Sequence, residues 1–166
     1  MPPLELYLVR HGLAGNAEPS QDDQLRPLTR AGTRRTRAVA RRLLQVGLCF
    51  DTLLTSPLLR ARQTADLLHA VGLSPRPKES VYLAPGGDFE SWLVWLRRWR
   101  RGGKRRLALV GHMPDLGAWG ERLVFGDVRQ RLVLKKAAIL GLVLPASGSP
   151  VARSLLFVLA PPRFLV

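Results

Sequence analysis

The chain has 166 residues, and its 26 lysines and arginines against 12 aspartates and glutamates give a formal net charge of +14 at pH 7. Hydrophobic residues make up 46% of it, which excludes wholesale disorder, and no apolar run reaches the roughly 18 residues of a membrane span. A single cysteine, Cys49, excludes an intrachain disulfide scaffold, and we expect it in the core. The length predicts one domain over 1–166. The N-terminus lacks a signal-peptide pattern, which predicts a cytoplasmic protein.

The first third of the chain predicts a strand, a loop and a helix. Leu4–Val9 is short and apolar, so we expect a buried strand that delivers residues 10–12 into a loop. Residues 13–28 are rich in Gly, Pro and Asp, which favours a loop. Thr29 is a suitable N-cap for a helix that continues to about Val46.

The middle of the chain alternates in the same way. Phe50–Thr55 predicts a strand, and Ser56 followed by proline predicts an N-cap for a helix to about Val71. Pro77–Leu83 predicts a weaker strand. Residues 89–101 predict a helix with three tryptophans at spacings of three and four, which favours a buried stripe over a base-stacking platform.

The last elements complete an α/β pattern. Arg106–Val110 predicts a strand, 115–125 a helix, and Ala138–Leu144 and Ser154–Leu159 two further strands. Strands alternating with amphipathic helices predict a three-layer α/β/α sandwich with a mostly parallel central sheet. No helix separates the last two strands, so one edge of the sheet is a candidate for antiparallel pairing.

Three short segments, at 10–12, 56–60 and 111–112, each follow a predicted strand. Ligands of open α/β sheets bind beyond the carboxyl ends of the strands. We therefore expect these segments to meet at one rim. The rim would gather two arginines and two histidines, namely Arg10, His11, Arg60 and His112. None of the three segments contains a carboxylate. The guanidinium group of arginine forms bidentate hydrogen bonds with phosphate oxygens, and a neutral histidine is a nucleophile. This set therefore predicts a pocket in which a phosphoryl group is transferred to histidine.

Three motifs carry a resemblance to a known family. Leu-Val-Arg-His-Gly at 8–12, Thr-Ser-Pro-Leu-Leu-Arg-Ala-Arg-Gln-Thr-Ala at 55–65 and Val-Gly-His-Met-Pro at 110–114 resemble, in order, the motifs of the histidine phosphatase (phosphoglycerate mutase-like) superfamily. Arg-Pro-Leu-Thr at 26–29 and Lys-Lys-Ala-Ala at 135–138 resemble its short SixA-type branch of phosphohistidine phosphatases, as does the brief insert before Arg26.

The resemblance implies a phosphoglycerate mutase-like fold and a role for each matching residue. His11 would attack phosphorus and become phosphorylated, and Arg10 and Arg60 would clamp the phosphoryl oxygens. His112 would stabilise the transferring group, and Arg26 would add a contact to the anion. Water would then release phosphate, and the reaction would need neither a metal ion nor a cofactor.

One feature departs from the larger superfamily, in which an acidic residue often protonates the leaving group. Glu79 and Asp88 are the nearest candidates here, and Asp88 also fits as the N-cap of the 89–101 helix. A missing acid favours a substrate with an easy leaving group. We therefore expect phosphohistidine on a signalling protein, of the phosphotransfer type, as the substrate.

Other readings of the sequence stay open. A phosphatase of small phosphate esters is the first alternative, and a basic nucleic-acid-binding module on a phosphatase-like fold is the second. Residues 97–106 hold seven basic residues in ten, which fits a solvated helix C-terminus or the docking of a nucleic acid or an acidic partner. Lys135 and Lys136 fit either the pocket rim or a solvated strand start. No membrane association is expected.

Overall fold

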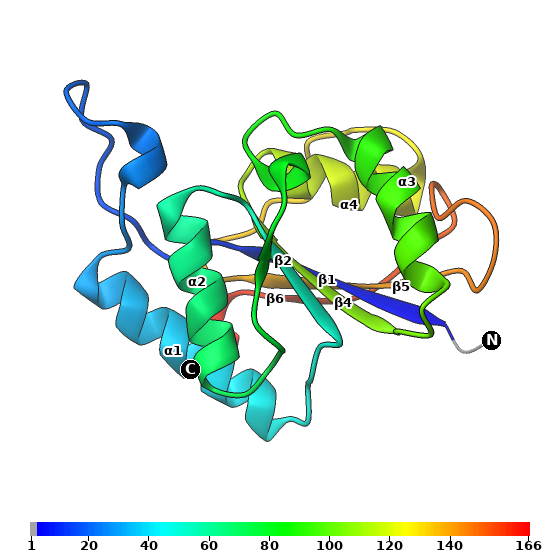
Figure 1. Cartoon of the computed structure of the whole chain (residues 1–166), viewed down its shortest axis with the longest axis horizontal. Coiled ribbons are helices and arrows are strands. Elements are labelled where there is room, and N and C mark those ends of the chain that lie inside the picture. The colour runs from blue at the N-terminus through cyan, green and yellow to red at the C-terminus, as the bar shows by residue number, and fades with distance from the viewer. Residues whose placement is uncertain (1–2) are drawn as a thin grey trace.

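The computed structural model describes residues 3–166 and contains a six-stranded sheet between two layers of helices (Figure 1). The order of the strands is β3-β2-β4-β1-β5-β6. Their bounds are β1 Leu4–Arg10, β2 Thr52–Thr55, β3 Lys78–Glu79, β4 Arg106–Gly111, β5 Ile139–Leu144 and β6 Leu155–Ala160. Strands β1 to β4 pair in parallel, whereas β5 and β6 are antiparallel, which confirms the predicted mostly parallel sandwich.

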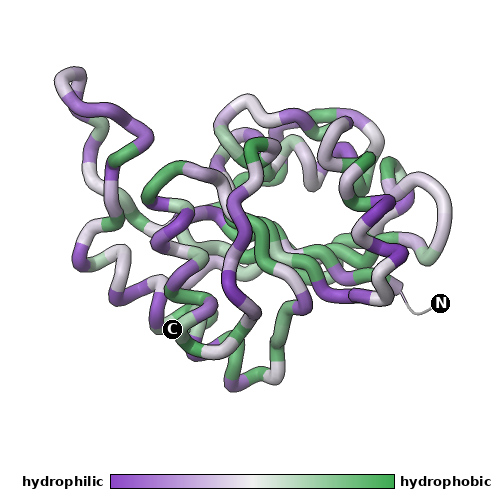
Figure 2. Tube along the Cα trace, in the orientation of Figure 1, coloured by the Kyte–Doolittle hydropathy of each residue, from purple (hydrophilic) through white to green (hydrophobic). Residues whose placement is uncertain are grey.

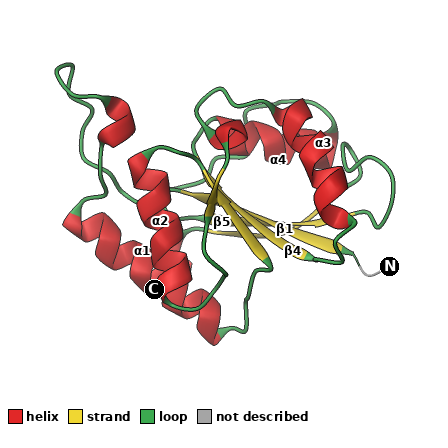
Figure 3. Cartoon of the chain, viewed as in Figure 1, coloured by secondary structure: helices red, strands yellow, loops and turns green. Residues whose placement is uncertain are grey.

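Four helices cover the two faces of the sheet (Figure 3). They are α1 Arg30–Gln45, α2 Leu59–Ala70, α3 Phe89–Arg100 and α4 Asp115–Phe125. Successive side chains of a strand point to opposite faces, and β1 divides accordingly. Leu6 and Leu8 belong to the core under α3 and α4, whereas Tyr7 and Val9 belong to the core under α1 and α2. The apolar strands lie in the middle of the molecule (Figure 2).

The predicted tryptophan stripe on α3 is confirmed as part of the core. Trp92 is fully buried, and its ring centroid lies 5.0 Å from that of Trp119 on α4. Trp95 and Trp99 are half-buried against the same core, and Trp99 Nε1 donates a hydrogen bond of 2.9 Å to Thr52 Oγ1. Such aromatic side chains each bury about 150–250 Å² of surface, so the stripe anchors α3 to the sheet.

Two predictions were wrong. Pro77–Leu83 is not one strand, because only Lys78–Glu79 pairs with β2 and a 3-10 turn follows at Val81–Leu83. β3 is an edge strand with exposed side chains, so little packing holds the chain extended there. Cys49 is exposed, since the buried position falls on the adjacent Phe50 and neighbouring extended residues face opposite sides.

Two surface features complete the fold. Edge strand β6 exposes large apolar side chains, including Leu155 and Phe157. The last turn of α3 carries Arg97, Arg98 and Arg100, so the basic run stands at a helix C-terminus, where cations are favourable. Within residues 3–166, no helix is long and apolar enough to cross a membrane.

Candidate active site

His11 stands at the carboxyl end of β1 and is only 3% exposed. Its Nδ1 lies 2.8 Å from the carbonyl oxygen of Gly12. A carbonyl oxygen only accepts hydrogen bonds, so Nδ1 carries the ring proton and Nε2 carries the lone pair. Glycine is required at position 12, because a Cβ there would lie 2.3 Å from Thr36 Oγ1. The backbone thus fixes which nitrogen of His11 is nucleophilic.

His112 follows β4, which is paired with β1, so the two histidines lie side by side. Their ring centroids are 5.1 Å apart at an interplanar angle of 53°. His112 Nε2 lies 2.7 Å from the hydroxyl of Ser56 at the end of β2. The prediction that Ser56 caps α2 was wrong, since the N-cap is Leu58 and carries no side-chain cap bond. Ser56 is too far ahead of the helix to cap it, and its hydroxyl instead orients His112.

The two predicted clamp arginines come from β1 and from the first turn of α2. Arg10 Nη1 donates to the carbonyl oxygen of Leu134 at 2.6 Å, which ties its fork to the segment before β5. Arg60 is 4% exposed. Both Nε atoms are buried without a hydrogen-bond partner among the described residues. Because unpaired buried donors are costly, these N–H groups favour binding of an anion.

Asp23, a carboxylate that the sequence analysis did not identify as a site residue, contacts Arg60 and Arg26. Asp23 belongs to a short 3-10 turn in the loop that projects from the body in Figure 1. Arg60 donates to its carbonyl oxygen at 2.7 Å and to its Oδ2 at 2.9 Å, and Arg26 Nε donates to Oδ1 at 2.8 Å. Partial burial raises the pKa of Asp23, but the two guanidinium groups outweigh it and hold the pKa below its usual range.

Lys136 also lies at the site, with Nζ 3.2 Å from Nε2 of His11. The backbone of the next residue, Ala137, holds Lys136 in this position. Ala137 adopts a left-handed backbone with φ 61°, and its N–H donates to the carbonyl oxygens of Arg10 and His11 at 3.1 and 3.2 Å. Of the two readings left open, the pocket rim is therefore right for Lys136, while Lys135 is exposed.

Burial and neighbouring cations keep both histidines neutral. Burial, followed by the charge of Lys136, lowers the pKa of His11 to about 3. Burial, followed by the charge of Arg60, lowers the pKa of His112 to about 4. Burial and the charge of Arg10 lower the pKa of Lys136 to about 8. At neutral pH the site therefore holds two uncharged imidazoles among fixed positive charges.

Neither candidate general acid, Asp88 or Glu79, contacts the histidines and cations of this site. Asp88 accepts hydrogen bonds from the N–H of Ser91 at 3.0 Å and from its hydroxyl at 2.6 Å, so it is the N-cap of α3. Glu79 forms an exposed ion pair with Arg62, with Nη1 and Oε1 3.3 Å apart.

Known proteins resemble this chain in sequence and in fold. The histidine phosphatase superfamily (branch 1) model matches residues 6–84. An uncharacterized protein of Picosynechococcus sp. (strain ATCC 27264 / PCC 7002 / PR-6) is 50% identical over 139 residues, which cover 84% of each chain. Phosphohistidine phosphatase SixA of Escherichia coli (strain K12) is 26% identical over 147 residues, covering 88% of this chain and 89% of that one.

The structural comparison agrees. The structure of the protein histidine phosphatase SixA complexed with tungstate has a TM-score of 0.85 at 24% identity and covers 98% of this chain and 100% of its own. Fold and relatives together define a phosphatase of the histidine-phosphatase type. The chain belongs to the histidine phosphatase superfamily, in its SixA-type branch.

Proposed function

We propose that the protein hydrolyses phosphohistidine on a signalling protein, through a phosphohistidine intermediate on His11. The observation that carries this proposal is the state of His11 itself. Its Nδ1–H donates to the carbonyl oxygen of Gly12, its Nε2 carries the lone pair and faces Lys136, and its pKa of about 3 keeps it neutral at physiological pH. A neutral imidazole surrounded by cations is suited to attack a phosphoryl dianion.

In the first step, the Nε2 lone pair of His11 forms a bond to phosphorus while the bond from phosphorus to the substrate's imidazole breaks. The departing imidazole keeps that electron pair and, with a proton on its other nitrogen, leaves as a neutral ring. The phosphorylated His11 ring likewise carries its proton on Nδ1. The exchange is therefore nearly symmetrical, and it needs no strong acid beside the leaving group.

In the second step, water attacks the phosphoryl group on His11. The N–P bond breaks, its electron pair returns to Nε2, and the water's surplus proton goes to solvent as inorganic phosphate leaves. Arg10, Arg60 and Lys136 supply the positive charge that stabilises both transition states, His112 donates a hydrogen bond to a phosphoryl oxygen, and Arg26 adds a contact from the loop. In this scheme no metal ion or cofactor takes part.

Small phosphate esters are the alternative substrates, because the pocket's charges would hold their phosphoryl groups equally well. The lack of a contacting acid favours phosphohistidine, since an alkoxide leaves less readily than an imidazole. A nucleic-acid-binding module is the weaker alternative, because it gives the oriented His11 ring no role. We further propose that residues 1–166 act as one domain in the cytoplasm.

The test is to measure phosphate release from phosphohistidine peptides and proteins and from sugar phosphates, with wild type and His11→Ala. We expect release from phosphohistidine, no turnover by a folded His11→Ala protein, and acid-labile, alkali-stable phosphate on His11 in trapped enzyme. Full activity of His11→Ala would overturn the mechanism. Turnover of small esters alone would overturn the protein substrate.

A further inference from the structure

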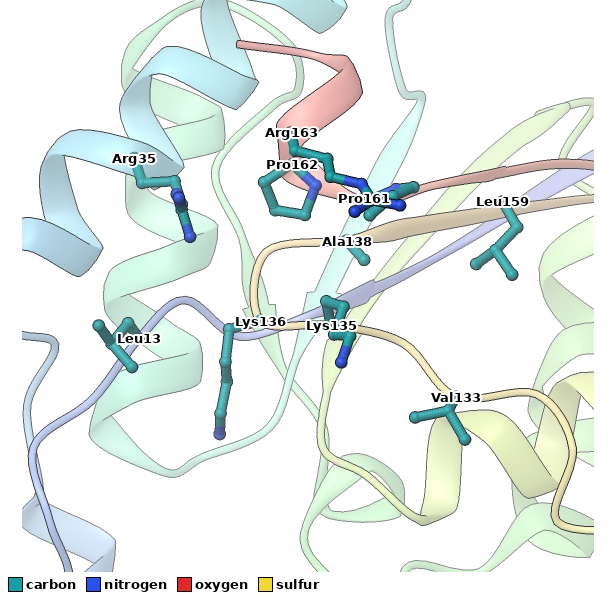
Figure 4. A pocket seen from close by; sticks show the side chains of 10 residues that line it. All are labelled: Leu13, Arg35, Val133, Lys135, Lys136, Ala138, Leu159, Pro161, Pro162 and Arg163. Atoms are coloured by element: carbon teal, nitrogen blue, oxygen red, sulfur yellow. The ribbon is translucent and has the colours of Figure 1, made fainter.

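A groove of about 600 Å³ opens beside the active site (Figure 4). Apolar side chains from three parts of the chain line it, namely Leu13 after β1, Val133 before β5 and Leu159 on β6. These side chains are 44%, 57% and 42% exposed. Lys136 lines the groove as well, and its Nζ contacts Nε2 of His11, so this side chain links the groove to the nucleophile, which does not itself line the groove.

The charges of the groove all have one sign. Its lining contains the cations Arg35, Lys135, Lys136 and Arg163 and no carboxylate. Among residues 3–166, none of these four side chains has an ion-pair partner. Because unpaired cations around an apolar surface complement an occupant with both acidic and apolar groups, the groove favours a ligand of mixed character.

We propose that this groove binds the polypeptide around the phosphorylated residue of the substrate, reading acidic and apolar side chains next to the phosphoryl group. The inference rests on the proposed function. Lys136 at the nucleophile and Arg163 in the C-terminal 3-10 turn line the same groove, so an occupant that fills it extends well beyond the phosphoryl group. A small ester would fill the catalytic end alone.

The lining also distinguishes a polypeptide from a nucleic acid. Sites for single-stranded nucleic acid combine cations with aromatic side chains on which bases stack. The groove has aliphatic and proline side chains instead, and no aromatic residue lines it within the part of the chain that the structure describes. Leu, Val and Pro surfaces bury the apolar side chains of a peptide, whereas they offer bases little to stack on.

The experiment compares two substrates across matched variants. One substrate is a phosphohistidine peptide with Asp, Glu and Leu around the phosphorylated residue, and the other is phosphoimidazole. The charge variant is Arg35→Glu with Arg163→Glu, and its control is Arg37→Glu on the same helix but outside the groove lining. The apolar variant is Leu159→Gln, and its control is Leu155→Gln on the same strand, also outside the lining.

We expect the charge variant to raise KM for the peptide about tenfold or more, with KM for phosphoimidazole unchanged, because charge pairs across an interface set encounter and register. Leu159→Gln should raise the peptide KM about threefold, and both controls should match wild type. The proposed role of the groove would be overturned if wild type and the charge variant had the same KM for the peptide. It would also be overturned if Arg37→Glu raised this KM as much as the charge variant does.

A second measurement separates this proposal from the proposed function. Fluorescence anisotropy of the labelled, unphosphorylated peptide reports docking without turnover. Weaker binding by the charge variant in an enzyme that releases no phosphate from phosphohistidine would support the groove while overturning the proposed function. If a single-stranded oligonucleotide binds more tightly than the peptide and loses affinity in the same variant, the occupant is a nucleic acid and the proposal fails.

Discussion

The ammonium group of Lys136 lies 3.2 Å from Nε2 of His11, although 125 residues separate the two in the chain. In the free protein this cation donates to the lone pair that we propose attacks phosphorus. An arriving phosphoryl group offers three oxygens with stronger negative charge, so Lys136 would then donate to one of them and release Nε2. One side chain would thus cover the nucleophile at rest and hold the substrate during transfer.

Removing this cation should change both the rate and the pH profile. We expect Lys136→Met to lower kcat/KM about 100-fold, since a lost donor at a transferring group costs of this order. Wild-type activity should fall above the Lys136 pKa of about 8, and that alkaline limb should vanish in the variant. The acid limb should move to higher pH, because the charge of Lys136 contributes to the low pKa of His11. Steady-state kinetics from about pH 2.5 to about pH 10 span the His11 pKa of about 3 and the Lys136 pKa of about 8, and so measure all three.

Lys135→Met is the matched control, because it removes the same charge one residue away without a recorded contact to His11. Its pH profile on phosphoimidazole should coincide with that of wild type. If both variants lose rate equally, Lys136 acts through general surface charge and the assigned role is incorrect.

Asp23 should compete with the phosphoryl group for Arg26 and Arg60. Its carboxylate receives hydrogen bonds from both arginines, at 2.8 and 2.9 Å, so an anion that engages their forks must displace it. We expect Asp23→Asn to lower the inhibition constant of inorganic phosphate about twofold to fivefold, because an exposed ion pair contributes up to about 1 kcal/mol. Phosphate inhibition of turnover gives the value.

Asp22→Asn provides the comparison, since Asp22 accepts a hydrogen bond from the N–H of Gln24 and has no recorded bond to either arginine. It should leave phosphate inhibition unchanged. Weaker phosphate binding by Asp23→Asn would show that Asp23 positions the arginines rather than competing for them.

The two buried histidines should make stability depend on pH. Their pKa values of about 3 and 4 lie below the ordinary 6.5, so between pH 6.5 and 4 the unfolded chain binds up to two more protons than the folded one. The free energy of unfolding should therefore fall with decreasing pH in this window, by about 1.4 kcal/mol per pH unit for each histidine. Urea unfolding at a series of pH values measures the slope.

His11→Gln should halve this slope, because one of the two titrating groups is gone while the ring's volume is largely kept. An unchanged slope in His11→Gln would mean that other groups cause the loss. Carboxylates with lowered pKa values contribute as the pH falls to their ordinary values, 4.5 for Glu121 and 3.8 for Asp23, so the histidine slope is measured between pH 6.5 and about 5.

Glu121 holds the segment that leads to the site. It is fully buried on α4 and accepts hydrogen bonds from the backbone N–H groups of residues 129–132, just before Leu134 and Lys136. Burial raises its pKa, but these four donors outweigh burial and lower the pKa below its usual range. Glu121→Gln should cost about 3 kcal/mol of unfolding free energy, since buried N–H groups lose their acceptor.

Thermal and urea unfolding of Glu121→Gln and of the exposed control Glu90→Gln test this. Glu90 pairs with Arg122 at the surface, and its loss should cost less than about 1 kcal/mol. A Glu121→Gln protein as stable as wild type would contradict the role of the carboxylate in holding residues 129–132.

The sequence was informative where topology alone decides position. His11 and His112 follow adjacent parallel strands, so the rule that ligands gather at strand ends was enough to bring them together. Ser56 was misjudged, because the same residue type caps helices and orients histidines, and only the three-residue delay before α2 distinguishes the two. Lys136 depends on the left-handed Ala137 and its bonds to β1, and Asp23 on the path of a loop. Neither signal is periodic. The sequence left Lys136 open between the pocket rim and a solvated strand start, and it did not point to Asp23.

Strand β6 exposes apolar side chains at the edge of the sheet, and the net charge of +14 affects whether copies of the chain associate there. A strand rich in Leu, Phe and Val whose outer edge is unpaired is a template for pairing with another copy. Arginines stand just outside both ends of β6, at 153 and 163, so antiparallel pairing of two copies would bring like charges together. They act as gatekeepers against edge-to-edge association. The basic surface thus also serves colloidal stability, because copies of this small protein repel one another.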